Sequence, residues 1–156
     1  MPRHGLSAAL LLVAILSFAT NAQESQRPNK TTNRIIRSVQ AVIDAQSAAW
    51  NRGDIEGYMD GYARSPNTVF VSGDTVTRGW QTVLDRYKKR YDSRDKMGTL
   101  TFSEIEIRPI GTDAAIVLGN WRLRRTNDEP HGKFSLFFRK TRQGWRIVHD
   151  HTSSAE

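Results

Sequence analysis

The order of the hydrophobic patterns constrains this chain most, because helical spacing comes first and strand-like sequence comes last. Apolar residues recur at three- and four-residue intervals from Ile35 to Trp50, from Ile55 to Tyr62 and from Trp80 to Tyr91. The second half is rich in β-branched and aromatic residues, and short turn sequences divide it into four predicted strands, 99–108, 114–125, 132–140 and 145–153. Since βαβ units would alternate the two patterns, this segregation predicts an α+β fold, with helices covering one face of a curled antiparallel sheet.

Glycines mark the corners between the predicted elements. Gly53 follows the first helical stretch and Asp54 stands where the next one begins, so we expect a glycine stop and then an aspartate N-cap. The β-rich stretches 68–72 and 75–78 flank Gly73-Asp74, which predicts a short hairpin before the third helix.

The first 22 residues have the pattern of a cleaved export signal. Arg3 and His4 form a basic head, residues 6–18 form an apolar run, and Ala22 is the small residue at the expected cleavage site. The run is shorter than the roughly 20 residues of a membrane-spanning helix. Residues 23–33 are polar and are expected to form a flexible leader before a domain at 34–154. We therefore expect a secreted or periplasmic protein that has no membrane association after cleavage.

Composition excludes several classes of function. Cysteine is absent, which rules out disulfides, thiol chemistry and lipid-modified cysteine. His149 and His151 could share a metal with His131, but no acidic cluster accompanies them, so no metal is predicted. Segment 86–96 carries six basic residues, yet its helical register places these charges on a solvated face, so nucleic-acid binding is not expected. No phosphate-binding glycine loop is present, and we expect no cofactor.

The last hairpin determines which side chains face the helices. A three-residue loop that ends in a left-handed Gly144 would place Thr141 opposite Trp145 and Leu136 opposite Asp150. The inner face would then hold Phe134, Leu136, Phe138, Val148, Asp150 and Thr152. His149 and His151 would lie on the outer face, whereas a tighter turn without a bulge would exchange the two faces.

Asp150 is then a carboxylate in a mostly apolar wall. Desolvation would raise its pKa and would allow it to act as a general acid or base near neutral pH. The alternative is a structural ion pair with Arg122 or Arg124 on the neighbouring strand.

The aromatic residues of the helical stretches are the candidates for a ligand-binding wall. Their side chains suit a flat apolar ligand, although the same spacing is what a hydrophobic core requires. The candidates are Trp50, Tyr58, Tyr62, Trp80 and Tyr87.

Four segments of the chain together resemble one family of small domains. They are AAWNRGD at 48–54, SPNTVFVSG at 65–73, RGWQTVLDRY at 78–87 and GWRIVHDHTSS at 144–154. They look like the SnoaL-like, nuclear transport factor 2-like superfamily, especially its ketosteroid-isomerase-like members and the association domain of calcium/calmodulin-dependent kinase II. The resemblance implies a curved sheet wrapped around long helices in a cone with an open pocket, and assembly into dimers or larger rings.

The resemblance also implies roles for individual positions. Arg122 matches a pocket arginine that helps the kinase association domain to bind small carboxylates, and Leu136 and Thr152 match two other arginines of that pocket. Leu136 would therefore line the ligand site. Isomerase members place a base and an oxyanion-binding tyrosine in the cone, for which Asp150 and Tyr62 are the nearest candidates here.

Three functions remain as hypotheses at this stage. The first is an exported domain that binds a small organic ligand, for which Arg122 favours a carboxylate. The second is a cofactor-independent isomerase, dehydratase or cyclase in which Asp150 moves a proton and Tyr58 or Tyr62 stabilises an oxyanion. The third is an oligomerisation module, a homodimer or larger homo-oligomer, that assembles through the outer face of the sheet.

Overall fold

The computed structural model describes residues 30–155. The predicted signal peptide (1–22) and most of the predicted leader (23–33) lie outside the described residues. Helix α1 (Lys30–Asn51) begins inside that leader segment, so residues 30–33 belong to the helix and not to a flexible linker. None of the described helices is long and apolar enough to cross a membrane.

Two further helices form where the spacing predicts them, α2 (Ile55–Met59) and α3 (Trp80–Arg90). The turn between α1 and α2 contains the predicted glycine stop and the predicted aspartate N-cap. Gly53 has a φ of 86°, a left-handed conformation that favours glycine. The Asp54 carboxylate accepts a 2.7 Å hydrogen bond from the backbone N–H of Gly57 and so caps α2.

A fourth helix, α4 (Arg94–Met97), was not predicted, because one turn is too short to show hydrophobic periodicity. The Ser93 side chain caps it by accepting from the backbone N–H of Lys96. The indole N–H of Trp50 donates to the Met97 carbonyl over 3.0 Å, which ties α4 to the end of α1.

The sheet has six strands in the order β2-β1-β6-β5-β4-β3. Neighbouring strands are antiparallel except for β1 and β6, which are parallel, so the fully antiparallel sheet of the prediction is corrected at that one pair. The predicted α+β class is confirmed. The strands are β1 (Val69–Ser72), β2 (Thr75–Arg78), β3 (Thr99–Ile110), β4 (Ala114–Arg124), β5 (His131–Thr141) and β6 (Gly144–Thr152).

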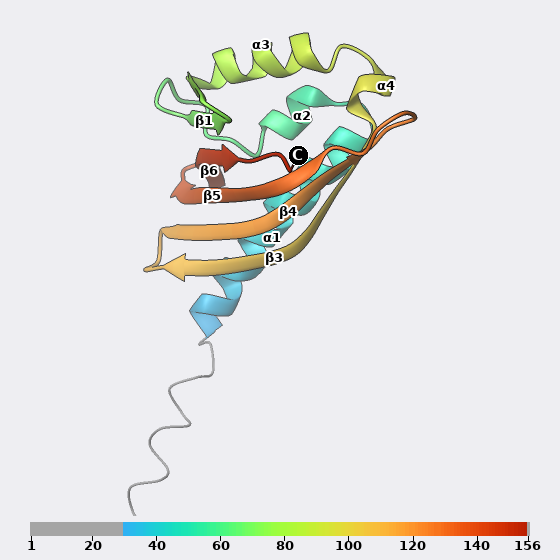
Figure 1. Cartoon of the computed structure of the whole chain (residues 1–156). Coiled ribbons are helices and arrows are strands. Elements are labelled where there is room, and N and C mark those ends of the chain that lie inside the picture. The colour runs from blue at the N-terminus through green and yellow to red at the C-terminus, as the bar shows by residue number, and fades with distance from the viewer. Residues whose placement is uncertain (1–29, 156) are drawn as a thin grey trace, which may run out of the picture.

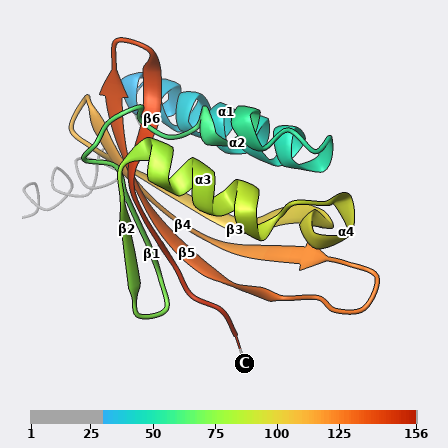
Figure 2. The same cartoon turned by 90° about the horizontal axis from the view of Figure 1, so that it is seen from above.

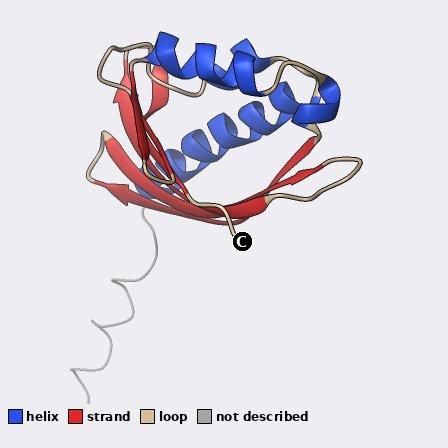
Figure 3. Ribbon diagram, turned by 45° about the horizontal axis from the view of Figure 1, so that its top comes forward, coloured by secondary structure: helices blue, strands red, loops and turns tan. Residues whose placement is uncertain are grey.

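All the helices lie on the concave side of the sheet, which curls but does not close (Figures 1 and 3). Part of the curl comes from a β-bulge in β3, where the register with β4 shifts between Ser103 and Glu106. Glu104 in this bulge has a φ of 51°. The short helix α2 lies between α1 and α3 and packs against both, and the view from above shows α1 and α2 together at one edge of the fold (Figure 2).

The core lies between the helices and the concave face of the sheet. Its fully buried members come from the helices and from the strands. They include Val39, Ile43, Met59, Val83, Val117, Phe138 and Ile147.

In the last hairpin Leu136 pairs with Asp150 as predicted, but the turn and the strand register that produce this pairing differ from the prediction. The turn is tighter than predicted, because Thr141 pairs with Gly144 and not with Trp145. A β-bulge then adds one residue, Val148, between the pairs Phe138–Ile147 and Phe137–His149. Without the bulge, the tight turn would place Asp150 on the outer face. The extra residue returns Asp150 to the inner face. Before the bulge, Ile147 takes the inner position that was predicted for Val148.

Candidate ligand pocket

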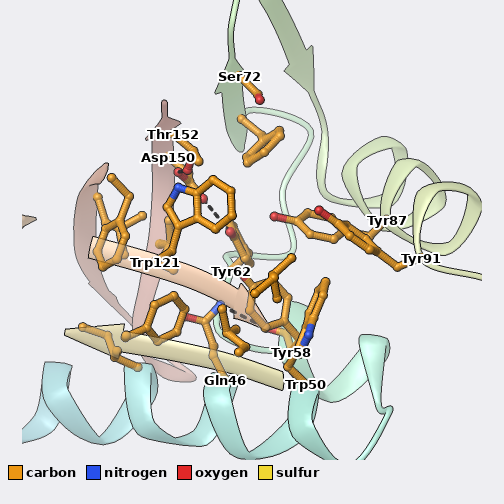
Figure 4. A pocket seen from close by; sticks show the side chains of 18 of the residues that line it. Gln46, Trp50, Tyr58, Tyr62, Ser72, Tyr87, Tyr91, Trp121, Asp150 and Thr152 are labelled. Atoms are coloured by element: carbon orange, nitrogen blue, oxygen red, sulfur yellow. Dashed lines mark hydrogen bonds between the residues drawn. The ribbon is translucent and has the colours of Figure 1, made fainter. Parts of the chain in front are cut away.

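A pocket opens between α1, α2, α3 and the concave face of the sheet (Figure 4). The space between its side chains, including the part open to solvent, is about 890 Å³. Nine of its 21 lining residues are aromatic, which suits a flat apolar ligand. The rings belong to Trp50, Tyr58, Tyr62, Phe70, Tyr87, Tyr91, Phe102, Trp121 and Phe134.

Asp150 lies deep in this wall and is 3% exposed. The Tyr62 hydroxyl donates to its Oδ2 over 2.6 Å, and the Thr152 hydroxyl donates to its Oδ1 over 2.8 Å. Burial raises the pKa of Asp150 to about 6, and the two hydrogen bonds and the nearby His151 oppose that rise. Asp150 therefore has the raised pKa that its apolar surroundings predict.

No ion pair holds Asp150, so the alternative of a structural pair with Arg122 or Arg124 is wrong for the described residues. Arg122 lies on the outer face of β4, where its guanidinium pairs with Glu129 over 3.1 Å and its side chain is 54% exposed. Arg124 is also exposed. Alternation along β4 is the reason, since Trp121 and Leu123 take the inner positions and line the pocket.

Backbone pairing brings Tyr62 to Asp150. The segment after α2 makes an isolated bridge to β6, in which the N–H of Ala63 donates to the Ile147 carbonyl over 2.8 Å. The N–H of Ile147 donates in turn to the Gly61 carbonyl over 2.9 Å. These bonds fix Tyr62 against β6 three residues before Asp150, although the two side chains are 88 positions apart in the chain.

Three tyrosines extend this polar end into the aromatic wall. The ring centroids of Tyr58 and Tyr62 are 6.1 Å apart, and those of Tyr58 and Tyr87 are 5.4 Å apart. Burial, together with the charge of Asp150, raises the pKa of all three phenols well above the usual value. At neutral pH they are therefore protonated hydrogen-bond donors.

Six of the predicted site residues meet in this pocket and two do not. Trp50, Tyr58, Tyr62, Tyr87, Leu136 and Asp150 all line it. Arg122 faces outward, as described. Trp80 packs outside the pocket, where its indole N–H donates to the Met59 carbonyl over 2.9 Å and the Arg64 guanidinium lies 4.5 Å from its ring centroid.

Several polar residues of the pocket were not predicted. Gln46 is buried and donates to the Tyr58 carbonyl over 3.1 Å. Its spacing from Ile43 and Trp50 could have placed it on the inner face of α1. Arg86 and Arg90 line the pocket from α3, which corrects the prediction that all charges of 86–96 belong to a solvated face. Ser72 and Ser154 also line the pocket, as does Thr152, which was predicted to lie on the inner face.

The histidines lie away from the pocket. His149 and His151 are exposed on the outer face of β6, where the predicted register places them. Within residues 30–155, no three His, Cys, Asp or Glu side chains gather as a metal site would require.

The family pattern of the SnoaL-like domain matches residues 39–155. The chain belongs to the SnoaL-like family. This SnoaL-like domain also resembles a solved nuclear transport factor 2-like protein of unknown function from Shewanella oneidensis. The two sequences are 36% identical over 76% of this chain and 98% of that one, with a TM-score of 0.73. None of the curated proteins matches the sequence.

More distant solved structures share the fold of this SnoaL-like domain. A nuclear transport factor 2-like superfamily protein from Salmonella enterica is 22% identical, over 80% of this chain and 94% of that one, with a TM-score of 0.66. A protein described as a putative calcium/calmodulin dependent protein kinase II association domain, from Xanthomonas campestris, is 18% identical. The alignment covers 76% of this chain and 86% of that one, with a TM-score of 0.62. The resemblance expected from the sequence motifs is thus confirmed at the level of family and fold.

Proposed function

We propose that this SnoaL-like domain binds a small, partly apolar organic molecule in the pocket described above. The observation that carries the proposal is the hydrogen-bonded pair of Asp150 and Tyr62, which forms a buried polar end of a pocket lined largely by aromatic and aliphatic side chains. Apolar pockets that carry a few converging polar groups are typical small-molecule sites, because the apolar wall supplies affinity and the polar groups fix orientation.

A thermal-shift screen of small carboxylates, steroids and aromatic acids tests this proposal. A ligand of this pocket should raise the melting temperature of the wild type by mass action. It should raise that of a Tyr58→Ala, Tyr87→Ala variant much less, because the aromatic wall is reduced. The matched control is Trp80→Ala, which removes an aromatic side chain outside the pocket. Equal shifts for both variants, or a screen without any stabilising compound, would contradict the proposal.

A second function, cofactor-independent proton transfer, is favoured by the raised pKa of Asp150. In an isomerisation, the Asp150 carboxylate would accept a proton from a carbon beside a carbonyl group, and the carbonyl oxygen would become an enolate oxygen. Asp150 would then return the proton to another carbon of the same molecule. Tyr58 can donate to the enolate oxygen, since the Tyr62 hydroxyl is already directed at Asp150.

The Asp150→Asn variant distinguishes binding from catalysis. It should keep the fold and the ligand-induced thermal shift while losing any turnover, because an amide cannot act as the base. The readout is hydrogen–deuterium exchange at carbons beside the carbonyl of a bound ketone, followed by NMR. Exchange at the same rate in Asp150→Asn would remove Asp150 from the reaction.

We also propose that the protein acts in the periplasm or outside the cell, on the basis of the export-signal pattern of residues 1–22. Expression of the full chain followed by N-terminal sequencing of the extracytoplasmic fraction tests this. A mature terminus near residue 23 supports export, and an intact terminus in the cytoplasmic fraction contradicts it.

Self-association through the outer face of the sheet is the remaining part of the proposal. Leu118 is 47% exposed there, and Phe137, His149 and His151 share the same face through their strand pairings. An exposed apolar side chain beside half-buried ones is typical of a surface that pairs with another copy. The third hypothesis is that oligomerisation is the main function. Light scattering that shows a large ring would favour this hypothesis, whereas a dimer fits the ligand-binding proposals.

A further inference from the structure

Two arginines line the pocket from one side of α3, and they are the cationic residues of its described lining. Arg86 and Arg90 are four residues apart and so lie on the same side of the helix. Arg86 is half-buried and Arg90 is exposed, whereas Asp150 is 3% exposed. The pocket therefore has its carboxylate at depth and its positive charges toward solvent.

Neither arginine is neutralised by the protein. Among residues 30–155, the ion pairs occupy other side chains, and Arg86 and Arg90 take part in none of them. Arg86 donates to the Thr77 hydroxyl over 2.8 Å, which leaves most of its five N–H donors for another partner.

Aromatic rings of the pocket hold both guanidinium groups in place. The Arg86 guanidinium carbon lies 5.3 Å from the centroid of Phe70, and that of Arg90 lies 5.8 Å from the centroid of Tyr91. Both rings line the pocket. If a ligand stacked on this wall carries a negatively charged group, that group can therefore lie within reach of the two guanidinium groups.

We propose that the ligand is an amphipathic organic anion, whose apolar body lies on the aromatic wall and whose carboxylate binds Arg86 and Arg90. This deepens the proposed function and rests on it. In this proposal, Arg86 and Arg90 of α3 bind the carboxylate, in place of Arg122 for which the family resemblance implied that role. The Asp150–Tyr62 pair is left to bind a polar, uncharged group of the ligand.

Calorimetric titration of cinnamate and its neutral amide, cinnamamide, tests the proposal with two probes of nearly the same shape. Wild-type protein should bind cinnamate about tenfold more tightly, which corresponds to one charge-assisted hydrogen-bonded pair. An Arg86→Gln, Arg90→Gln variant should bind the two probes equally. The control variant, Arg37→Gln with Lys89→Gln, removes two exposed charges outside the pocket and should retain the preference.

The outcomes separate this inference from the proposed function. Equal binding of acid and amide by the wild type, or a preference that survives loss of both arginines, overturns the anion site but leaves pocket binding intact. Failure of the wild type to bind either probe counts against both. High salt should weaken the binding of cinnamate and leave the binding of cinnamamide unchanged. The opposite result would also overturn the anion site.

Discussion

The Tyr62 hydroxyl donates to Oδ2 of Asp150 over 2.6 Å, at the buried end of a pocket lined by aromatic rings. A donor at this distance stabilises the ionised carboxylate, while the surrounding apolar wall destabilises it. The net result is an acid whose pKa, at about 6, lies close to neutral. The stability and the chemistry of the pocket both depend on this balance.

Removal of the Tyr62 hydroxyl should raise the pKa of Asp150 further. The Tyr62→Phe variant loses a hydrogen bond to the charged form, so we expect a loss of about 1–3 kcal/mol in the free energy of unfolding above neutral pH. Denaturant titration measures this loss, and carboxyl-carbon NMR measures the pKa. Tyr91→Phe is the matched control, because Tyr91 also lines the pocket and Asp150 shows no hydrogen bond to it. Equal effects of the two variants would contradict the assigned role of Tyr62.

The raised pKa of Asp150 predicts a specific dependence of stability on pH. The folded-state pKa of about 6 exceeds the ordinary value of 3.8, so the folded protein binds the proton more tightly than the unfolded chain does. The contribution of Asp150 is therefore present below about pH 4 and is lost as the pH rises through about 6, by about 2–3 kcal/mol in total.

Urea denaturation of wild type and Asp150→Asn across this pH range isolates that contribution, because the other acids are common to both proteins. The asparagine variant should gain stability relative to wild type as the pH rises from about 4 to about 7. A difference that does not change with pH would show that the Asp150 pKa is not raised.

Gly61 precedes Tyr62 and lies against the side chain of Gln46, which lines the pocket. A Cβ on Gly61 would lie 2.5 Å from the side-chain carbonyl carbon of Gln46, so Gly61→Ala should destabilise the protein by about 1–3 kcal/mol. The double variant Gly61→Ala, Gln46→Ala should recover part of that loss, because the clashing group is gone. A double-mutant cycle by thermal denaturation measures the recovery. Strictly additive losses would mean that the two side chains do not compete for this space.

Arg122→Leu should leave ligand binding unchanged, since Arg122 lies on the outer face and pairs with Glu129. The pair is exposed, so the free energy of unfolding should change by less than about 1 kcal/mol. Calorimetry with cinnamate, alongside the Arg86 and Arg90 variants, checks both points. A selective loss of cinnamate affinity in Arg122→Leu would restore the role that the sequence resemblance implied.

The sequence predicted the elements of this fold better than it predicted the pocket. Hydrophobic spacing and turn residues predicted α1, α2, α3 and the strands within a few residues, whereas the single turn of α4 was too short to show periodicity. The pairing of Leu136 with Asp150 was predicted correctly, although the tight turn and the Val148 bulge offset each other in a way that the sequence does not reveal. Trp80 was assigned to the pocket because helical spacing does not distinguish a cavity wall from packed core.

Arg86 and Arg90 were missed for a related reason. On a helix that lies over a closed core, residues beside Tyr87 would point to solvent, and this was the prediction. Here the sheet curls without closing, so the flank of α3 borders an opening and the arginines line it. Closure of the sheet depends on pairings between distant strands, which the local pattern does not contain.

A crystal structure of the protein soaked with cinnamate tests the central claim most directly. The account predicts density for the phenyl ring against Tyr58 and Tyr87, with its carboxylate within hydrogen-bonding distance of Arg86 or Arg90 and with the Tyr62–Asp150 bond intact. A pocket closed by its own side chains, or cinnamate bound only elsewhere on the surface, would contradict it.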